Sequence, residues 1–144
     1  MAASGLFQEE GKEINHAEDA ARCCLNCQKS MEEINSKLDS SLEIRIGVNS
    51  GGPLIGGVLG TDKPTFDIIG DTINVAARLQ STDIPGNVQI SEETKKMIEN
   101  LEFNIEERGE IYLKGKGNKL TYFVSYCNKE DPGNTLNLLM SSKE

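Results

Sequence analysis

Phe66-Asp-Ile-Ile-Gly-Asp-Thr-Ile-Asn-Val-Ala-Ala-Arg-Leu-Gln80 is the stretch from which the organisation of this chain can be worked out. The apolar run before Gly70 predicts the end of a strand, and Asp71 stands in the position of a helix N-cap. On a helical wheel the apolar residues that follow fill an arc of roughly 200°, whereas Asn74 and Arg78 lie together on the opposite side. The stretch therefore predicts a strand, a turn and a helix that carries an amide and a guanidinium one turn apart.

Upstream of this stretch the sequence predicts two strands and a helix. Residues 1–7 have the composition of a strand, and Asn15 with Glu18 has the form of an N-cap followed by an acidic residue in the first turn. The alternation of apolar and polar residues over 44–48 predicts a half-buried strand. Between them, apolar side chains recur in steps of three and four, which predicts an amphipathic helix to about residue 38. These side chains are Ala17, Ala20, Ala21, Cys24, Cys27, Met31, Ile34 and Leu38.

The glycine-dense segment 51–60 has two interpretations. Backbone N–H groups of such a segment can hold a phosphate, but this one lacks a Gly-Lys-Ser/Thr ending and does not open a helix. A tight hairpin with the following strand at 66–69 accounts for the glycines at least as well.

Downstream, a short strand at 87–90 leads to Ser91, whose hydroxyl can cap a helix with Met97, Ile98 and Leu101 on one face. Further strands are predicted at about 103–107, 110–114 and 120–126. The last two are joined by a basic, glycine-rich turn, Lys114-Gly-Lys-Gly-Asn-Lys119. We expect one domain over residues 1–127 and a flexible C-terminal tail over residues 128–144.

The length and the net charge of the chain exclude some classes of binding partner. The chain has 144 residues, which corresponds to one domain or part of one, and its formal net charge is −8. A chain this acidic has no overall attraction for nucleic acid or for an anionic membrane surface, so neither is an expected partner. No stretch approaches the roughly 20 apolar residues that span a bilayer, and the start lacks the form of a secretory signal. We therefore expect a cytoplasmic chain.

The histidine and the cysteines, whose side chains often take part in catalysis, are expected to have structural roles here. The only histidine, His16, has no partners for a Ser/His/Asp or Cys/His arrangement. The four cysteines are expected to be free thiols, and Cys24 and Cys27 are expected on the buried helix face rather than in a zinc site, because no second pair exists.

The residues around the opening stretch have two interpretations. In one, these residues are functional: Asn74 and Arg78 project from one helical stripe, Asp67 precedes the strand end, and Lys114 with Lys116 marks a basic turn elsewhere in the sheet. The alternative is a solvated helix face, a turn residue and a solubilising hairpin. From spacing and residue type alone, both interpretations stay open.

The opening stretch resembles the signature helix of the class III adenylate and guanylate cyclases. The resemblance extends over most of the chain, and further segments look like motifs of that family in the family's order. They are Ile44-Arg-Ile-Gly-Val-Asn-Ser-Gly51, Gly56-Gly-Val-Leu-Gly60, Val88-Gln-Ile-Ser-Glu-Glu-Thr94, Arg108-Gly-Glu-Ile-Tyr-Leu-Lys-Gly-Lys-Gly117 and Thr121-Tyr-Phe123. The resemblance implies an α+β, ferredoxin-like nucleotide cyclase fold that pairs head to tail with a second cyclase domain, as a homodimer or a heterodimer. The nucleoside triphosphate would bind in the cleft between the two.

The resemblance also implies a role for each candidate side chain. Asp67 looks like the purine reader, since a carboxylate accepts from the adenine amine; ATP is thus the expected substrate and GTP the alternative. Asn74 looks like the residue that orients the ribose, and Arg78 like the cation that stabilises charge on the α-phosphoryl group. Lys114 looks like the ligand of the β- and γ-phosphates.

In the family, two aspartates hold two Mg²⁺ or Mn²⁺ ions. By the resemblance, both aspartates belong to a part of the domain that lies before Met1, and the fold would be truncated at its N-terminus. We therefore expect no metal ligands in this chain and no cyclase activity from residues 1–144 alone. A truncated gene model or a partial copy is the expected origin, and the parent protein is attached to a membrane in many relatives.

Two hypotheses of function follow from the resemblance. In the first, the chain supplies the purine and transition-state half of a dimeric, adenylate-type cyclase that converts ATP to cyclic AMP and pyrophosphate in intracellular signalling. In the second, it is a non-catalytic module that pairs with a complete cyclase domain and regulates it.

Overall fold

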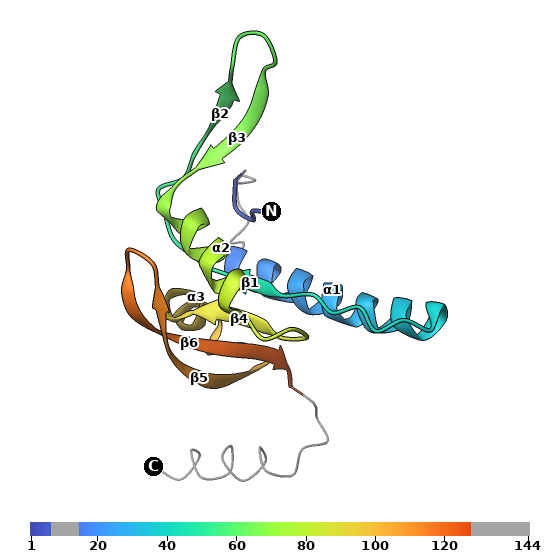
Figure 1. Cartoon of the computed structure of the whole chain (residues 1–144). Coiled ribbons are helices and arrows are strands. Elements are labelled where there is room, and N and C mark those ends of the chain that lie inside the picture. Colours follow the sequence, from blue (N-terminus) through green and yellow to red (C-terminus); the bar gives the residue numbers. More distant parts are fainter. Residues whose placement is uncertain (7–14, 128–144) are drawn as a thin grey trace, which may run out of the picture.

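The computed structural model describes residues 1–6 and 15–127, and its elements form a four-stranded sheet, a separate two-stranded hairpin and three helices (Figure 1). The helices are α1 (His16–Leu38), α2 (Asp71–Thr82) and α3 (Glu92–Ile98). The strands are β1 (Ile46–Val48), β2 (Ile55–Leu59), β3 (Thr65–Ile69), β4 (Val88–Ser91), β5 (Phe103–Leu113) and β6 (Gly117–Tyr126). This is a mixed α+β fold, as predicted. In the described part, no helix is both long and apolar enough to cross a membrane.

The main sheet has the order β1-β4-β6-β5, in which β1 and β4 run parallel and the other pairs run antiparallel. Neighbouring residues of a strand point to opposite faces of a sheet. Val48 and Ile90 point to the face covered by α1 and α3, where the core gathers, whereas Gly47 and Gln89 point toward α2. The sheet thus separates α2, which carries two of the candidate residues, from the core side. The buried core consists of Ala17, Ala21, Leu25, Val48, Val88, Ile90, Ile98, Phe103, Tyr122 and Val124.

Strands β2 and β3 form a hairpin that projects from the start of α2, away from the main sheet (Figure 1). Apolar side chains on both of its faces are exposed, among them Ile55, Val58, Phe66 and Ile69. The hairpin confirms the structural interpretation of the glycine-dense segment.

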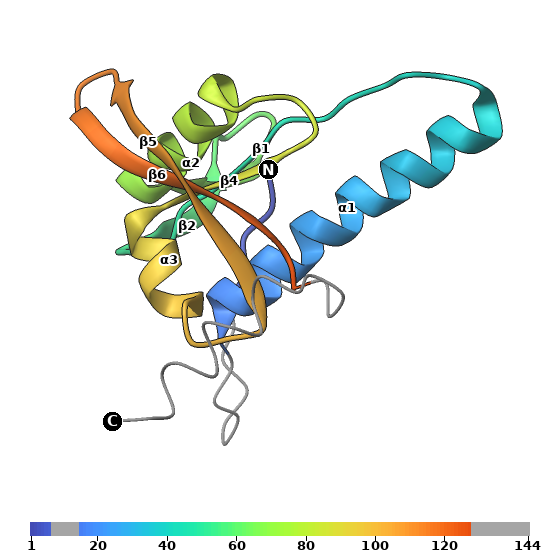
Figure 2. The same cartoon turned by 90° about the horizontal axis from the view of Figure 1, so that it is seen from below.

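Helix α1 begins as predicted, because the Asn15 side chain accepts a hydrogen bond from the Glu18 N–H. Only its first half contributes buried residues to the core, at Ala17, Ala21 and Leu25. The prediction that Cys27 lies on the buried face was wrong, because this side chain is exposed. Helix α1 extends beyond the sheet, which covers only part of its length (Figure 2). All four cysteines are free thiols, as predicted.

Three other local predictions need correction. Residues 1–6 form no strand, because no described strand lies beside them to complete a ladder; residue 7 lies outside the described part. Asp71 is the first residue of α2 and not its N-cap, which is Gly70, because the Asp71 carboxylate pairs with Lys116 instead. The two strands predicted over 103–114 are one strand, β5, with an irregularity between Glu107 and Gly109. The predicted tail at 128–144 lies outside the described residues.

Helix α2 lies against β1 backbone to backbone at Gly47. A Cβ atom added to this glycine would lie 2.2 Å from the Gln80 nitrogen and 2.5 Å from the Ala76 oxygen. Neither atom can move without moving the helix, so the absence of a side chain at Gly47 sets the height of α2 above the sheet.

We predict that Gly47→Ala lowers the free energy of unfolding by at least about 2 kcal/mol, because a methyl group cannot enter this contact without displacing α2. Urea denaturation monitored by circular dichroism measures the change. Gly57→Ala is the matched control, since an added Cβ there meets no atom within 4 Å, and it should stay within about 0.5 kcal/mol of wild type. Equal stability of the two variants would contradict the role given to Gly47.

Candidate active site

Helix α2 carries Asn74 and Arg78 on one stripe, because residues four apart face the same direction on a helix. Asn74 is exposed and Arg78 is half-buried. Both side chains point away from the contact with β1, in which Ala76 and Gln80 take part. The packing of α2 therefore leaves this amide and this guanidinium available to a ligand.

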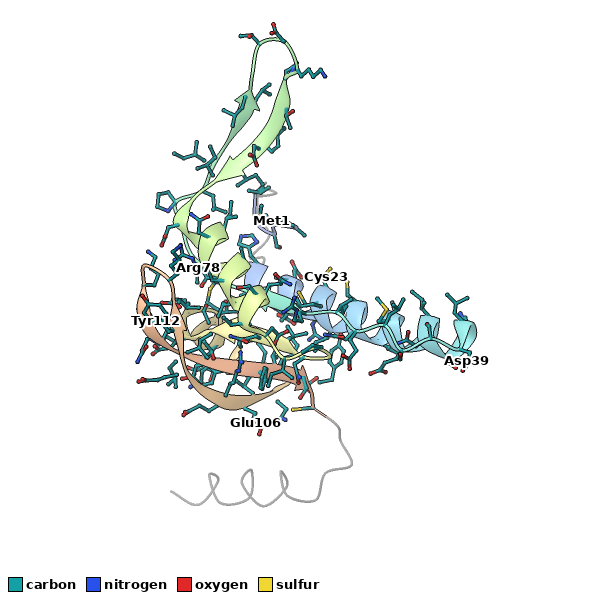
Figure 3. The ribbon with its side chains drawn as sticks, in the orientation of Figure 1. Met1, Cys23, Asp39, Arg78, Glu106 and Tyr112 are labelled. Carbon is teal, nitrogen blue, oxygen red and sulfur yellow. The ribbon has the colours of Figure 1, made fainter. Side chains whose placement is uncertain are left out.

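Arg78 lies beside the turn that joins β5 to β6 (Figure 3). A Cβ atom added to Gly115 in that turn would lie 3.6 Å from Nη1 of Arg78, and Gly115 has a φ of +76°, which favours glycine. Lys114 precedes this glycine and is exposed. The structure thus brings Arg78 and the turn that carries Lys114 together, although they are far apart in the sequence.

The turn is also tied to the first residue of α2 by an ion pair between Nζ of Lys116 and Oδ2 of Asp71. Both side chains are substantially exposed, so the pair contributes little to stability, and its effect is to orient the turn. Among the described residues, neither Lys114 nor Arg78 forms an ion pair. Arg78 therefore stands beside the turn that carries Lys114, and neither side chain pairs with a carboxylate in the described part, which is an arrangement suited to an anionic ligand.

Asp67 makes no contact with Arg78 or with the turn that carries Lys114 among the described hydrogen bonds and ion pairs. It lies on β3 in the projecting hairpin, opposite Gly57, and its side chain is exposed. Oδ1 of Asp67 accepts a hydrogen bond from the N–H of Ile68 at 2.8 Å, which leaves Oδ2 available to another donor.

The candidate residues lie on an open surface rather than in a cavity. A cleft of about 280 Å³ lies near the first turn of α2, and its lining includes Asn49, Thr72 and Lys119 but none of the four candidate side chains. In the described residues, no group of three or more His, Cys, Asp or Glu side chains could hold a metal ion. The side chains present therefore do not fit the two-metal site that the sequence resemblance implies, and we derive no step through a metal.

A chain of hydrogen bonds holds the C-terminal end of α2, and the sequence analysis missed it. The Arg108 guanidinium donates to Oε1 of the fully buried Gln89, whose Nε2 donates to Oγ1 of Thr82 at 3.4 Å. Oγ1 of Thr82 in turn donates to the carbonyl of Arg78 at 2.9 Å. The backbone of Arg78 is thus linked to β4 and β5. A polar residue within the apolar strand 87–90 was the signal available in the sequence.

Asp83 follows α2 and is 5% exposed. Its Oδ2 accepts from the Ile46 N–H at 3.0 Å, and its Oδ1 is buried without a partner among the described residues. Burial raises the pKa of the Asp83 carboxyl above its usual range, and the Ile46 N–H and the nearby Arg108 only partly offset this effect. No sequence pattern pointed to this residue.

The cysteine nearest the core is not a nucleophile. Burial, together with the neighbouring thiols of Cys23 and Cys27, raises the pKa of Cys24 to about 12. Its thiol therefore stays protonated at neutral pH.

The fold and the cationic surface define an α+β domain suited to a phosphorylated ligand. A family model described as "Adenylate and Guanylate cyclase catalytic domain" matches residues 1–126. The chain belongs to this family.

Individual relatives agree with this assignment. Adenylate cyclase type 9 of Gallus gallus is 35% identical over 132 residues, which are 88% of this chain and 10% of that protein. The guanylate cyclase domain of RhGC from Catenaria anguillulae, solved in complex with GTP, has a TM-score of 0.74 and 33% identity and covers 85% of this chain and 65% of that one. The adenylyl cyclase CyaB from P. aeruginosa has a TM-score of 0.75 and 26% identity, over 87% of this chain and 67% of that one. The chain therefore spans about a tenth of its curated relative and about two thirds of these solved domains.

We predict that Asp83→Asn removes a pH-dependent loss of stability. The pKa of the Asp83 carboxyl is raised in the folded state. The contribution of this carboxyl to the free energy of unfolding is therefore fully present below its pKa in the unfolded chain, and it is lost as the pH rises through its pKa in the folded protein. As the pH rises above about 4, the usual pKa of an aspartate, wild type should therefore lose stability relative to Asp83→Asn. Urea midpoints across this range provide the measurement, and the exposed Asp62→Asn is the matched control. A constant difference between wild type and Asp83→Asn would contradict the pKa direction.

Proposed function

We propose that this chain supplies the purine-reading and transition-state side of a composite nucleotide cyclase site, which converts ATP to cyclic AMP and pyrophosphate. One observation supports this most strongly: Arg78 lies beside the turn that carries Lys114, on the same stripe as Asn74 and on an open surface. These are the side chains that a triphosphate and a ribose need, and an open surface suits a site completed by a second cyclase domain.

In the reaction, the ribose 3′-oxygen attacks the α-phosphorus and loses its proton, and the bond from the α-phosphorus to the bridging oxygen of pyrophosphate breaks. Catalysis of such a displacement depends on alignment and on stabilisation of charge. The Arg78 guanidinium stabilises the charge that develops on the α-phosphoryl oxygens, and the amide of Asn74 orients the ribose. Lys114 binds the β- and γ-phosphates and the charge on the leaving pyrophosphate.

Asp67 selects the base in this proposal. Its exposed carboxylate accepts a hydrogen bond from the exocyclic amine of adenine and repels the O6 carbonyl of guanine. Because Asp67 lies on the projecting hairpin, base selection depends on how the second domain packs against this hairpin. The exposed apolar side chains on both faces of the hairpin, such as Val58 and Phe66, suit burial against such a domain.

A second candidate function is a regulatory module that pairs with a complete cyclase domain. The observation that favours it is the lack, among the described residues, of a cluster that could hold a metal ion. In this case the chain either contributes side chains to the active site of the complete domain or blocks that site, and it catalyses no reaction alone.

We predict that the isolated chain forms no cyclic AMP, and that a restored domain does. The restored domain is CyaB in which the two thirds that match this chain are replaced by the matching residues of this chain. In that domain, Arg78→Ala should lower kcat by about 10²–10³-fold, since it removes one stabilising cation from the transition state. The exposed Arg45→Ala is the matched control and should leave kcat unchanged.

Two results would contradict the first function. One is robust cyclic AMP production by residues 1–144 alone, and the other is an Arg78→Ala restored domain as active as its parent. If the restored domain is inactive while the isolated chain changes the rate of complete CyaB equally with and without Arg78, the regulatory function is the correct one.

We predict that Asp67→Cys in the restored domain lowers the ratio of kcat/KM for ATP to that for GTP by about tenfold or more, because the acceptor for the adenine amine is lost. Parallel assays with both nucleotides measure this ratio. Asp62→Cys, in the turn of the same hairpin, is the control. An unchanged ratio would refute the role of Asp67.

A further inference from the structure

Gln89 is a fully buried polar side chain between two apolar residues of β4. It lies on the face of the sheet that carries α2, directly beside Gly47 in the parallel pairing of β1 with β4. Both polar atoms of its amide are used, since Oε1 accepts from the Arg108 guanidinium and Nε2 donates to Oγ1 of Thr82 at 3.4 Å. A buried amide is costly when it is unpaired, so the loss of either partner would leave one of these atoms unsatisfied.

Arg108 reaches Gln89 from the outer strand on the other side of the sheet. It lies on β5, at the irregularity between Glu107 and Gly109, and β6 separates this strand from β4. Its guanidinium carbon lies 5.5 Å from the centroid of the Phe123 ring, and Phe123 is the residue of β6 that pairs with Gln89. The guanidinium therefore crosses β6 over this ring. Stacking on the ring and the hydrogen bond to Gln89 together hold it in place.

Two hydroxyl groups converge on the backbone carbonyl of Arg78. Oγ1 of Thr82 and Oγ of Ser81 each donate to it at 2.9 Å. The Thr82 hydroxyl also accepts from Gln89, whereas the Ser81 side chain is exposed and its hydroxyl has no hydrogen bond to the sheet in the described part. A comparison of these two residues therefore separates the link to the sheet from the mere presence of a hydroxyl beside Arg78.

The link to the sheet constrains how α2 is rotated about its own axis. The contact at Gly47 involves no side chain of the strand, so it sets the distance of α2 from the sheet more than its rotation. The bond from Gln89 to Thr82 holds the helix at a second place, in its last turn. Because side chains reach about 5–6 Å from a helix axis, a rotation of about 10° moves their ends by about 1 Å. A misplacement of this size lowers the rate of an enzyme strongly.

The direction of the Arg78 guanidinium depends on this rotation. Arg78 stands one turn before Thr82 on α2, and its Nη1 lies 3.6 Å from the position of a Cβ atom added to Gly115 in the β5–β6 turn. Among the described residues, its side chain has no hydrogen-bond or ion-pair partner of its own. The backbone that carries Arg78 therefore decides where the guanidinium points.

We propose that Arg108 is a positioning residue for Arg78 and acts through Gln89 and Thr82. The chain of hydrogen bonds fixes the rotation of α2, and with it the direction of the Arg78 guanidinium toward the α-phosphoryl group of the nucleotide. The inference rests on the proposed function, in which Arg78 stabilises the charge on that group. Arg108, Gln89 and Thr82 act through Arg78 and make no contact with the nucleotide.

The test uses the restored domain and breaks the chain of hydrogen bonds at two separate places. Thr82→Val keeps the shape of the side chain and removes its hydroxyl, and Arg108→Met keeps an apolar stem over Phe123 and removes the guanidinium. Each variant should lower kcat for ATP by about tenfold or more while KM changes by less than about twofold, because the loss concerns the transition state. Thr82→Ser restores the hydroxyl and should recover most of the lost kcat. Ser81→Ala is the matched control and should leave kcat unchanged.

A double-variant cycle separates positioning from a general structural effect. In a restored domain that already carries Arg78→Ala, Thr82→Val should change kcat by less than about twofold, because the guanidinium that Thr82 positions is absent. A merely structural role of Thr82 would lower kcat by the same factor with and without Arg78. Circular dichroism spectra identify any variant that fails to fold, in which case the variant at the other place still decides the test.

A second readout needs no catalysis and uses the full chain of 144 residues. Residual dipolar couplings of backbone N–H groups, measured by NMR, report how α2 is oriented relative to β4 and β6. Thr82→Val and Arg108→Met should both change the couplings of α2, whereas Ser81→Ala should not.

Three results would overturn the proposal. They are an unchanged kcat for either Thr82→Val or Arg108→Met, an equal loss of kcat with and without Arg78, and unchanged dipolar couplings of α2 in both variants. In each of these cases the proposed function still stands if Arg78→Ala lowers kcat. An Arg78→Ala domain as active as its parent would instead contradict the proposed function, and this inference with it, so the two failures are distinguishable.

Discussion

The contact of α2 with β1 at Gly47 is the constraint on which the arrangement of this domain depends. The backbone of the helix lies so close to the strand that no Cβ atom fits between them. This contact directs Asn74 and Arg78 outward and brings Arg78 beside the β5–β6 turn. The hydrogen bonds from Arg108 through Gln89 to Thr82 fix the other end of the same helix, so both the height and the orientation of α2 are set by the sheet.

The electrostatics of the domain follow from the same arrangement. The chain is acidic overall, with a formal charge of −8, yet Arg78 lies beside the turn that carries Lys114, and neither pairs with a carboxylate among the described residues. Asp71, the first residue of α2, is paired with Lys116 of this turn. In the proposed function, Arg78 and Lys114 attract a phosphorylated small molecule, although the acidic protein has no general attraction for nucleic acid.

Much of the local structure was predictable because it depends on short-range physics. The Asn15 cap, the end of α1 near residue 38, the hairpin in the glycine-dense segment and the Ser91 cap all follow from side chains within a few positions of each other. The predictions that failed concern residues whose structure or burial depends on segments distant in the sequence. Residues 1–6 have the composition of a strand but pair with no described strand, and Cys27 is exposed although helical periodicity places it on the apolar face of α1.

By itself, the sequence determined the order of the elements, the shared stripe of Asn74 and Arg78, and the family of the domain, because these depend on periodicity and on contiguous motifs. Only the tertiary structure decided that Arg78 meets the turn of Lys114, that Asp67 stands apart on a projecting hairpin, and that Asp83 is buried. The physical reason is that burial and proximity arise from packing between segments far apart in the chain, and no local pattern records which segments meet.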